Sequence, residues 1–232
     1  MVNFFDENPY DITKIIVENP ESVIAHINLS KIKTISDFLN LKAGSKILDC
    51  GCGTGFPTLF YSSENQHRYF SIDISNAELS LAKKYSQSFN KEIEWLMGDG
   101  CHLPFKDNSF DAAFCIALLH HIDKYQDLVD ELVRVAKKIV VCEPNKFCPM
   151  QWIYQRQNGA KLAGDTKAFS MNELKTTFQK SGLHTIHYKR INLIPQTITQ
   201  AQLNHWKIVE DYLLRCFLTN IFAGTIVIYG EK

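Results

Sequence analysis

Short apolar runs alternate with amphipathic stretches along most of the chain, and this alternation constrains the fold more than any other feature. Seven runs have the length of β-strands, at residues 45–50, 67–73, 92–97, 110–118, 138–143, 183–194 and 224–230. The first five are almost continuously apolar, which is typical of central parallel strands covered on both faces. The sequence therefore predicts an α/β fold with a Rossmann-like, doubly wound, mostly parallel sheet and helices on both faces.

The predicted helices begin at recognisable capping residues. Ser75 with Glu78, and Ser170 with Glu173, have the spacing of capping boxes. Asp123 can cap the amphipathic stretch that follows the fourth strand. These signals place helices between the strands.

Both ends of the chain also indicate helices. Residues 23–39 form the clearest N-terminal segment, and residues 199–220 are predicted to form one long amphipathic helix. Its predicted inward residues are Leu203, Trp206, Val209, Leu213, Cys216 and Phe217. Because the chain has no repeat, low-complexity tract or linker, residues 1–232 are expected to form a single domain.

Composition and charge argue against several classes of protein. Lysine plus arginine and aspartate plus glutamate both number 25, so the chain lacks the positive surplus typical of nucleic-acid binders. The longest apolar run, residues 112–119, is far shorter than the roughly 20 residues that span a bilayer, and the N-terminus has no signal-peptide pattern. Seven irregularly spaced cysteines fit reduced thiols. We expect a cytoplasmic protein without a nucleic-acid or membrane partner, and the oligomeric state stays open.

A glycine-rich loop follows the first predicted strand, in the stretch ILDCGCGTGFP. A dinucleotide fingerprint needs glycine at the sixth position, but counting from Gly51 this is Phe56, and from Gly53 it is Thr58. Pro57 suits the first turn of a helix, so a helix is expected from about Phe56. The glycines still allow a tight turn and a close approach to a ligand.

The same loop contains two cysteines, Cys50 and Cys52, at a spacing that also suggests a thiolate metal or redox site. The chain has no second ligand pair at zinc spacing. We therefore expect no metal here, and interpret both cysteines as small residues tolerated at the turn.

Acidic residues end three successive predicted strands, at Asp49, Asp73 and Asp99. Carboxyl ends of parallel strands meet at one edge of a sheet, where a nucleoside can lie across them. A carboxylate after the second strand can accept both ribose hydroxyls, and Asp99 can accept a hydrogen bond from an adenine amine. With the loop, these acids predict a nucleoside site.

Four segments, ILDCGCGTG, IDIS, GDGCHLPFKDNSFD and LLHHI, resemble the class I S-adenosylmethionine-dependent methyltransferases. The most similar branch contains the ubiquinone- and menaquinone-biosynthesis type of enzyme and many small-molecule methyltransferases. The resemblance covers about residues 45–145 and departs from the family where VAKKIVV replaces a Pro-Gly-Gly turn. It implies a seven-stranded sheet with an antiparallel last strand, S-adenosyl-L-methionine as cofactor and S-adenosyl-L-homocysteine as product.

The resemblance also assigns roles by position. The cofactor-binding residues that it implies are Asp49, Gly51, Gly53, Gly55, Asp73, Ile74, Asp99, Gly100, Cys101 and Ile116. Within the single domain it implies an N-terminal helical cap at residues 1–44 and an S-adenosylmethionine-binding core at 45–145. Residues 146–232 then supply the rest of the sheet and the acceptor-side helices.

Acceptor-side residues are less sharply indicated. His120 and His121 follow the fourth strand, and are either a catalytic general base and acceptor contact or residues packed at a helix entry. Glu143 and Asn145 follow the fifth strand near the same crevice, with the same two interpretations. The aromatic residues Phe4, Phe5 and Tyr10 either cover the acceptor or pack the N-terminus.

The sequence thus predicts an enzyme that transfers a methyl group by in-line displacement to the O, N or C atom of a small molecule. Residues 116–119 lack the Asp/Asn-Pro-Pro-aromatic motif of nucleic-acid amine methylases, and Cys115 follows Phe114 rather than the proline of cytosine-C5 methylases. The alternatives are a tRNA or rRNA methyltransferase and a non-catalytic S-adenosylmethionine-binding regulatory subunit. An NAD-linked reductase is disfavoured by the missing sixth-position glycine.

Overall fold

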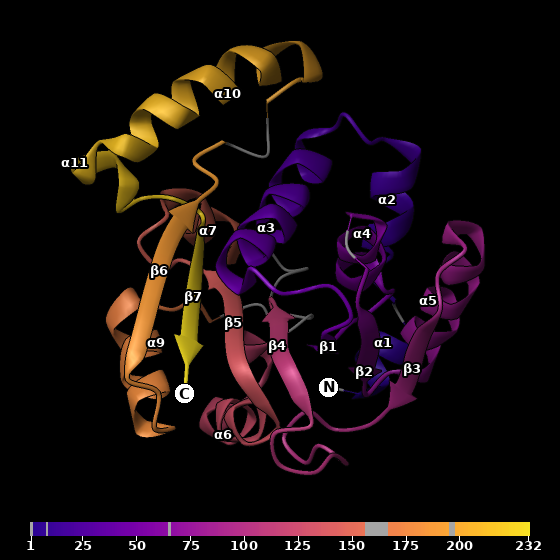
Figure 1. The fold of residues 1–232 in the computed structure, drawn as a ribbon. Coiled ribbons are helices and arrows are strands. Elements are labelled where there is room, and N and C mark those ends of the chain that lie inside the picture. The colour runs from indigo at the N-terminus through magenta and orange to yellow at the C-terminus, as the bar shows by residue number, and fades with distance from the viewer. Residues whose placement is uncertain (1, 8, 65, 156–166, 195–197) are drawn as a thin grey trace.

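The computed structural model describes residues 2–7, 9–64, 66–155, 167–194 and 198–232, and within them seven strands form one sheet (Figure 1). The strands are β1 (Lys46–Cys50), β2 (Arg68–Asp73), β3 (Ile93–Met97), β4 (Phe110–Ile116), β5 (Ala136–Pro144), β6 (Thr185–Ile191) and β7 (Thr225–Glu231). Their order is β3-β2-β1-β4-β5-β7-β6, and β7 runs antiparallel to both of its neighbours while the other pairs are parallel. The predicted fold class is confirmed, including the antiparallel last strand.

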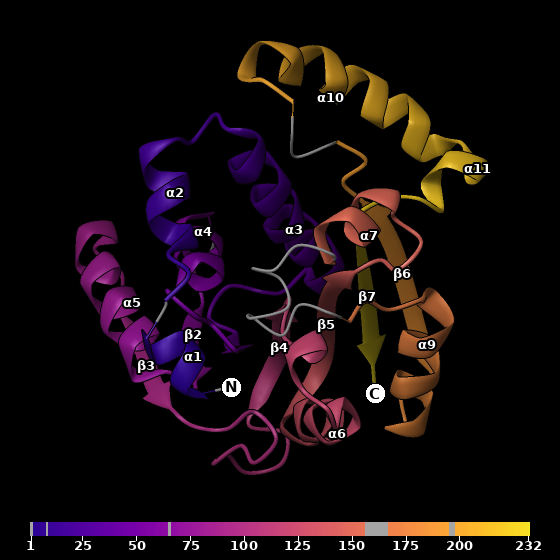
Figure 2. The same cartoon turned by 180° about the vertical axis from the view of Figure 1, so that it is seen from behind.

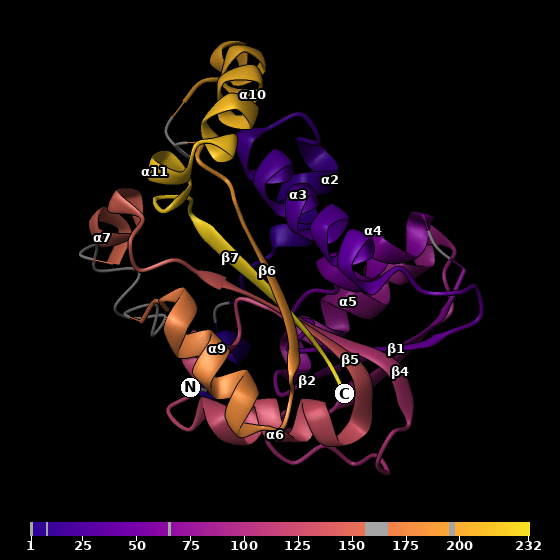
Figure 3. The same ribbon diagram turned by 60° about the vertical axis from the view of Figure 1, so that its left-hand side comes forward.

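Helices cover both faces of this sheet, as predicted. The helices are α1 (Val2–Glu7), α2 (Ile12–Glu18), α3 (Val23–Leu39), α4 (Phe56–Glu64), α5 (Asn76–Phe89), the 3-10 turn η1 (Leu119–His121), α6 (Tyr125–Val135), α7 (Pro149–Gln155), α9 (Met171–Lys180), α10 (Gln200–Arg215) and α11 (Phe217–Asn220). Figure 3 shows α3, α4 and α5 on one side of the sheet and α6 and α9 on the other. None of the described helices is long and apolar enough to cross a membrane.

Strand β4 explains why the central runs are continuously apolar. Its side chains alternate between faces. Ala113 and Cys115 belong to the buried cluster under α6 and α9, whereas Ala112 and Phe114 belong to the cluster under α3 and α4. Both faces of β4 are therefore buried, and its sequence shows no alternation of apolar and polar residues.

The predicted helix starts have mixed outcomes. The capping box of Ser170 and Glu173 is present in full. Asp123 does not cap α6, because the helix begins one residue later than predicted. Its N-cap is Lys124, which makes no side-chain cap hydrogen bond. The predicted cap at Asp123 is therefore wrong.

The capping box predicted for Ser75 is only half formed. Its hydroxyl accepts the N–H of Glu78 at 3.2 Å, but Glu78 does not reach back, because Asp73 already accepts the N–H of Ser75 at 2.9 Å. Glu78 instead accepts the N–H of Tyr10 at 3.3 Å. Because Glu78 does not complete the capping box, its carboxyl group can contact the N-terminal segment instead.

The long C-terminal helix predicted at residues 199–220 is broken. Cys216 has an extended backbone, with φ −81° and ψ 123°, and separates α10 from α11. Leu203 is buried as predicted, but Val209 and Cys216 are exposed, so the predicted inward face is wrong for these two. The side chain of Phe217 lies outside the described residues. Figures 1 and 2 give the reason: α10 lies beside one end of α3 and beyond the sheet, so only a narrow face of it is covered.

Candidate active site

The glycine loop connects β1 to α4 by a turn that only glycine adopts easily. Gly51, Gly53 and Gly55 all have left-handed backbones, with φ of 72°, 51° and 83°. A side chain at Gly51 would begin 2.7 Å from the Leu118 side chain, and one at Gly55 2.7 Å from Trp95. The loop is therefore packed directly against the turn after β4 on one side and against β3 on the other.

Asp73, at the end of β2, binds this loop from the side. Its Oδ2 accepts the N–H of Gly53 at 2.8 Å, and its Oδ1 accepts the N–H of Ser75 at 2.9 Å. Burial raises the pKa of Asp73, and these backbone N–H groups counteract that rise. Each carboxylate oxygen keeps a second lone pair, so Asp73 can still accept hydrogen bonds from a ligand.

Asp49 lies beneath the loop and is 1% exposed. Its Oδ2 accepts the Thr58 hydroxyl at 2.6 Å, whereas its Oδ1 is buried without a hydrogen-bond partner among the described residues. Burial raises the pKa of Asp49 to about 7, with the charge of Asp73 adding to the rise and the Thr58 hydroxyl opposing it. A buried acceptor without a partner is unusual in a folded protein.

Asp99 follows β3 and is the most exposed of the three acids. It accepts hydrogen bonds from the N–H of Cys101 at 2.9 Å and from His102 Nδ1 at 3.0 Å, and the His102 interaction is the main reason why its pKa is lowered. A side chain at Gly100 would begin 2.8 Å from Cys50 Sγ, so this loop is held close to the end of β1.

Two apolar residues of the predicted set lie at the ends of neighbouring strands. Ile74 follows Asp73 directly and is 43% exposed, which leaves an apolar surface beside a half-buried acid. Ile116 ends β4 and is half-buried against the α3–α4 cluster. Ala117, the next residue, has a left-handed backbone with φ 56°, a strained conformation for a residue with a Cβ.

The turn after β4 is held by a buried carboxylate from β5. Glu143 is 1% exposed, and its Oε1 accepts the N–H groups of Leu118 at 2.9 Å and Leu119 at 2.7 Å. Its Oε2 lies 2.7 Å from Nδ1 of His120, whose side chain is 5% exposed. Asn145 instead donates to the carbonyls of Ile221 and Ala223, at 2.9 and 2.7 Å, and so supports the chain before β7.

His121 connects this turn to the N-terminus. Its ring contacts Phe5 of α1 edge-on, with centroids 5.2 Å apart, and lies 4.0 Å from the ring of His120. The side chain of Phe4 lies outside the described residues, and Tyr10 is 60% exposed. Among the described side chains, Phe5 therefore reaches the turn after β4.

Comparisons with known proteins agree with this geometry. The family described as "Methyltransferase domain" matches residues 48–141. Demethylmenaquinone methyltransferase of Lactiplantibacillus plantarum is 29% identical over 181 residues, covering 66% of this chain and 76% of its own. A solved SAM-dependent methyltransferase of Thermotoga maritima, described as a possible histamine N-methyltransferase, superposes over 100% of both chains with a TM-score of 0.71 and 15% identity. Residues 48–141 of the chain therefore form a methyltransferase domain of the class I S-adenosylmethionine-dependent type.

A third relative shows how far the likeness extends. The 24-methylenesterol C-methyltransferase 2 of Arabidopsis thaliana is 32% identical over 103 residues. This match covers 44% of our methyltransferase and only 28% of the sterol enzyme. The shared part is therefore less than half of either chain.

The described residues of the methyltransferase fit its cofactor, S-adenosylmethionine. The cofactor carries a sulfonium and an ammonium group, which suit a loop lined by the carboxyl groups of Asp49 and Asp73. The unpartnered Oδ1 of Asp49 offers an acceptor for an N–H donor. The tight glycine backbone lets a ligand approach the main chain without meeting side chains.

The two cysteines of the glycine loop are buried. Cys50 and Cys52 are 0% and 2% exposed, and burial raises the pKa of both thiols well above the usual range. Both thiols are therefore protonated at neutral pH in the free protein. Within the described residues, no three His, Cys, Asp or Glu side chains are grouped to hold a metal ion.

Sequence reasoning missed two acids at this site. Glu78 is 8% exposed, and its Oε2 lies 3.2 Å from where a Cβ of Gly53 would be, although its position suggested only a helix cap. Asp6 of α1 accepts the Ser75 hydroxyl at 2.8 Å and the N–H of Ala77 at 3.2 Å, at the start of α5. No sequence pattern joins Asp6 to a helix that begins 70 residues later, so only the tertiary structure reveals this contact.

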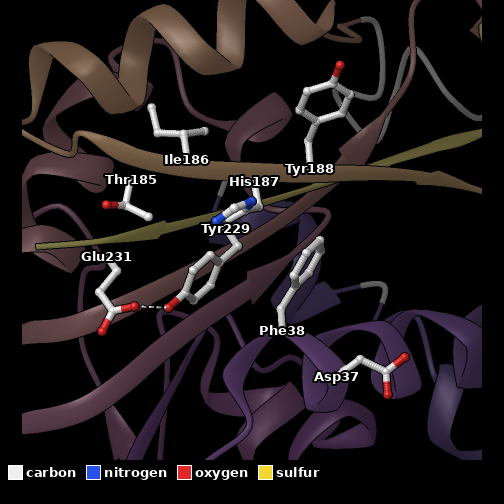
Figure 4. Close-up of a pocket in the computed structure, with 8 residues that line it drawn as sticks. All are labelled: Asp37, Phe38, Thr185, Ile186, His187, Tyr188, Tyr229 and Glu231. Atoms are coloured by element: carbon white, nitrogen blue, oxygen red, sulfur yellow. Dashed lines mark hydrogen bonds between the residues drawn. The ribbon is translucent and has the colours of Figure 1, made fainter.

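A separate groove lies at the opposite edge of the sheet, at the amino end of β6 (Figure 4). Tyr229 stacks on Phe38 of α3 with ring centroids 5.7 Å apart and on His187 at 6.1 Å. None of the residues assigned to the cofactor lines this groove. It is therefore distinct from the candidate active site.

Proposed function

We propose that this methyltransferase transfers a methyl group from S-adenosylmethionine to an O, N or C atom of a small, partly apolar molecule in the cytoplasm. The observation that carries the proposal is the packing of Leu118 on Gly51, which brings the histidine turn directly onto the glycine loop. The relatives named for methylating demethylmenaquinone and a methylenesterol support a small-molecule acceptor. The even charge balance supports the same choice over RNA.

The residues that would hold the cofactor surround this packing contact. They are Asp49, Gly51, Gly53, Gly55, Asp73, Ile74, Asp99, Gly100, Cys101 and Ile116. Asp73 would accept the ribose hydroxyls, Asp99 would accept from the adenine amine, and the glycine loop with Asp49 would hold the methionine part. The N-terminal cap, this core and the C-terminal half would act as one catalytic domain.

S-adenosylmethionine supplies an electrophilic methyl carbon: as a lone pair of the acceptor bonds to it, the carbon–sulfur pair stays on sulfur and S-adenosylhomocysteine is released. The protein must then mainly align the acceptor with that carbon, which contributes on the order of 7–11 kcal/mol. A general base at His120 or His121 would add a factor of about 10²–10⁴. Positioning therefore outweighs proton transfer.

Calorimetric titration of cofactor and product tests the donor half of this proposal. Asp73→Ala should weaken the binding of both by about 1–3 kcal/mol, because the ribose loses a charged acceptor. Asp111→Ala is the matched control, since Asp111 also accepts a backbone N–H, from Lys46 at 3.0 Å, but at the amino end of β4. Unchanged binding in Asp73→Ala contradicts the donor assignment.

The acceptor half needs a screen. The protein is incubated with methyl-labelled S-adenosylmethionine and a metabolite extract, and the labelled product is identified by mass spectrometry. Label in a small molecule is expected. Label found only in RNA would overturn the proposed acceptor class.

A further inference from the structure

The hydrogen bond between His120 and Glu143 holds the turn after β4 and also determines which nitrogen of the His120 ring carries a proton. Glu143 lies on β5 and His120 in the turn after β4, and 23 residues separate them. Three donors converge on one carboxylate: two backbone N–H groups on Oε1, and the His120 ring nitrogen at 2.7 Å on Oε2. Several N–H donors favour the ionised form of a carboxyl group.

An ionised Glu143 determines which ring nitrogen of His120 carries the proton. A carboxylate only accepts hydrogen bonds, so Nδ1 must donate at 2.7 Å. In a neutral imidazole, a protonated Nδ1 leaves the lone pair on Nε2. Nε2 is therefore the nitrogen that can take up a proton.

We propose that Glu143 is the positioning residue that sets His120 as the general base, for an acceptor atom that gives up a proton when it is methylated. This rests on the proposed function. The proton of the acceptor passes to Nε2 of His120, while the pair left on the acceptor atom forms the bond to the methyl carbon. The imidazolium that results is stabilised by Glu143 through Nδ1–H, and it later returns its proton to water.

The first test measures the tautomer of His120 and needs no acceptor. In protein labelled with ¹⁵N-histidine, long-range ¹H–¹⁵N spectra distinguish a protonated from an unprotonated ring nitrogen, and His120→Gln identifies the His120 signals by their loss. We expect a proton on Nδ1 and a lone pair on Nε2 in the neutral ring. The opposite tautomer in the unmodified protein overturns the proposal.

Glu143→Gln sharpens this test. The glutamine oxygen can still accept the two backbone N–H groups, but its amide nitrogen is a donor and forces Nδ1 to accept, so the proton should move to Nε2. Glu210→Gln is the matched control, because Glu210 is also buried and also accepts two backbone N–H groups, from Leu193 at 2.6 Å and Ile194 at 3.2 Å. The control should leave the His120 signals unchanged.

Activity and cofactor binding separate this inference from the proposed function. With labelled S-adenosylmethionine and the metabolite extract, Glu143→Gln should lower kcat about 10²–10⁴-fold while its calorimetric Kd for the cofactor stays within a few-fold. Normal turnover by a folded Glu143→Gln overturns the inference but leaves the methyltransferase assignment intact. Failure of the unmodified protein to bind the cofactor overturns the proposed function, and the tautomer measurement then tests only whether Glu143 sets the protonation of the His120 ring.

Discussion

Replacing Glu78 with glutamine removes a buried carboxyl group beside the glycine loop without removing its hydrogen bond. Glu78 is 8% exposed and accepts the N–H of Tyr10 at 3.3 Å, which a glutamine oxygen can also do. Burial is the main cause that raises the pKa of Glu78 from 4.5 to about 7, and the charge of Asp73 adds to it. The folded protein therefore holds a proton that the unfolded chain gives up more easily.

The sign and size of the effect follow from this difference in pKa. Below pH 4.5 the group is protonated in both states and has no effect on the free energy of unfolding. Between pH 4.5 and about 7 only the unfolded chain loses the proton, so stability falls as the pH rises. Above pH 7 the loss in the free energy of unfolding no longer grows. At about 1.4 kcal/mol per pKa unit, this loss is at most about 3 kcal/mol. Glu78→Gln should therefore stabilise the protein by about 1–3 kcal/mol at pH 8 and hardly at all at pH 4.5.

Urea unfolding of both proteins at pH 4.5, 6 and 8 measures this gain. Glu94→Gln, on the exposed side of β3, is the matched control for the chemical change. A gain in stability that is confined to pH 6 and 8 agrees with the reasoning. If Glu78→Gln is no more stable at pH 8 than at pH 4.5, relative to the unmodified protein, the carboxyl group does not hold a proton at neutral pH and the reasoning is refuted.

Two further predictions concern the same loop. Asp49 and Glu78, whose pKa values are raised to about 7, should ionise on binding a cation, so the Kd for S-adenosylmethionine should fall as the pH rises from 6 to 8. The uncharged thioether of S-adenosylhomocysteine should show a smaller change, and equal pH dependence in calorimetry would contradict this. Gly51→Ala combines a left-handed backbone, φ 72°, with a contact of 2.7 Å to Leu118. It should cost about 1–3 kcal/mol of stability in urea unfolding, and adding Leu118→Ala should restore the part due to the contact; no restoration would attribute the loss to the backbone alone.

Several features were predictable because they depend on short-range patterns. The continuous apolar run of β4 correctly predicts a buried central strand, because both of its faces are covered. The third run, in contrast, forms the edge strand β3, which is only partly buried. The capping box at Ser170 forms as its spacing predicts, because a cap needs only four neighbouring residues. The box at Ser75 fails because a residue just outside the pattern, Asp73, competes for the same backbone N–H.

The sequence alone determined the sheet, its helices, the family and the cofactor, because strand periodicity and the Asp-x-Gly-x-Gly-x-Gly loop are local in the chain. It could not choose between His120 and His121, since both follow the same strand. The distinction that we propose depends on Glu143, which β5 brings to 2.7 Å from the ring of His120. Only the tertiary structure decided the pKa values of Asp49 and Glu78. Both are raised because distant segments of the chain exclude water from these side chains, and the residues next to them in the sequence do not predict this burial.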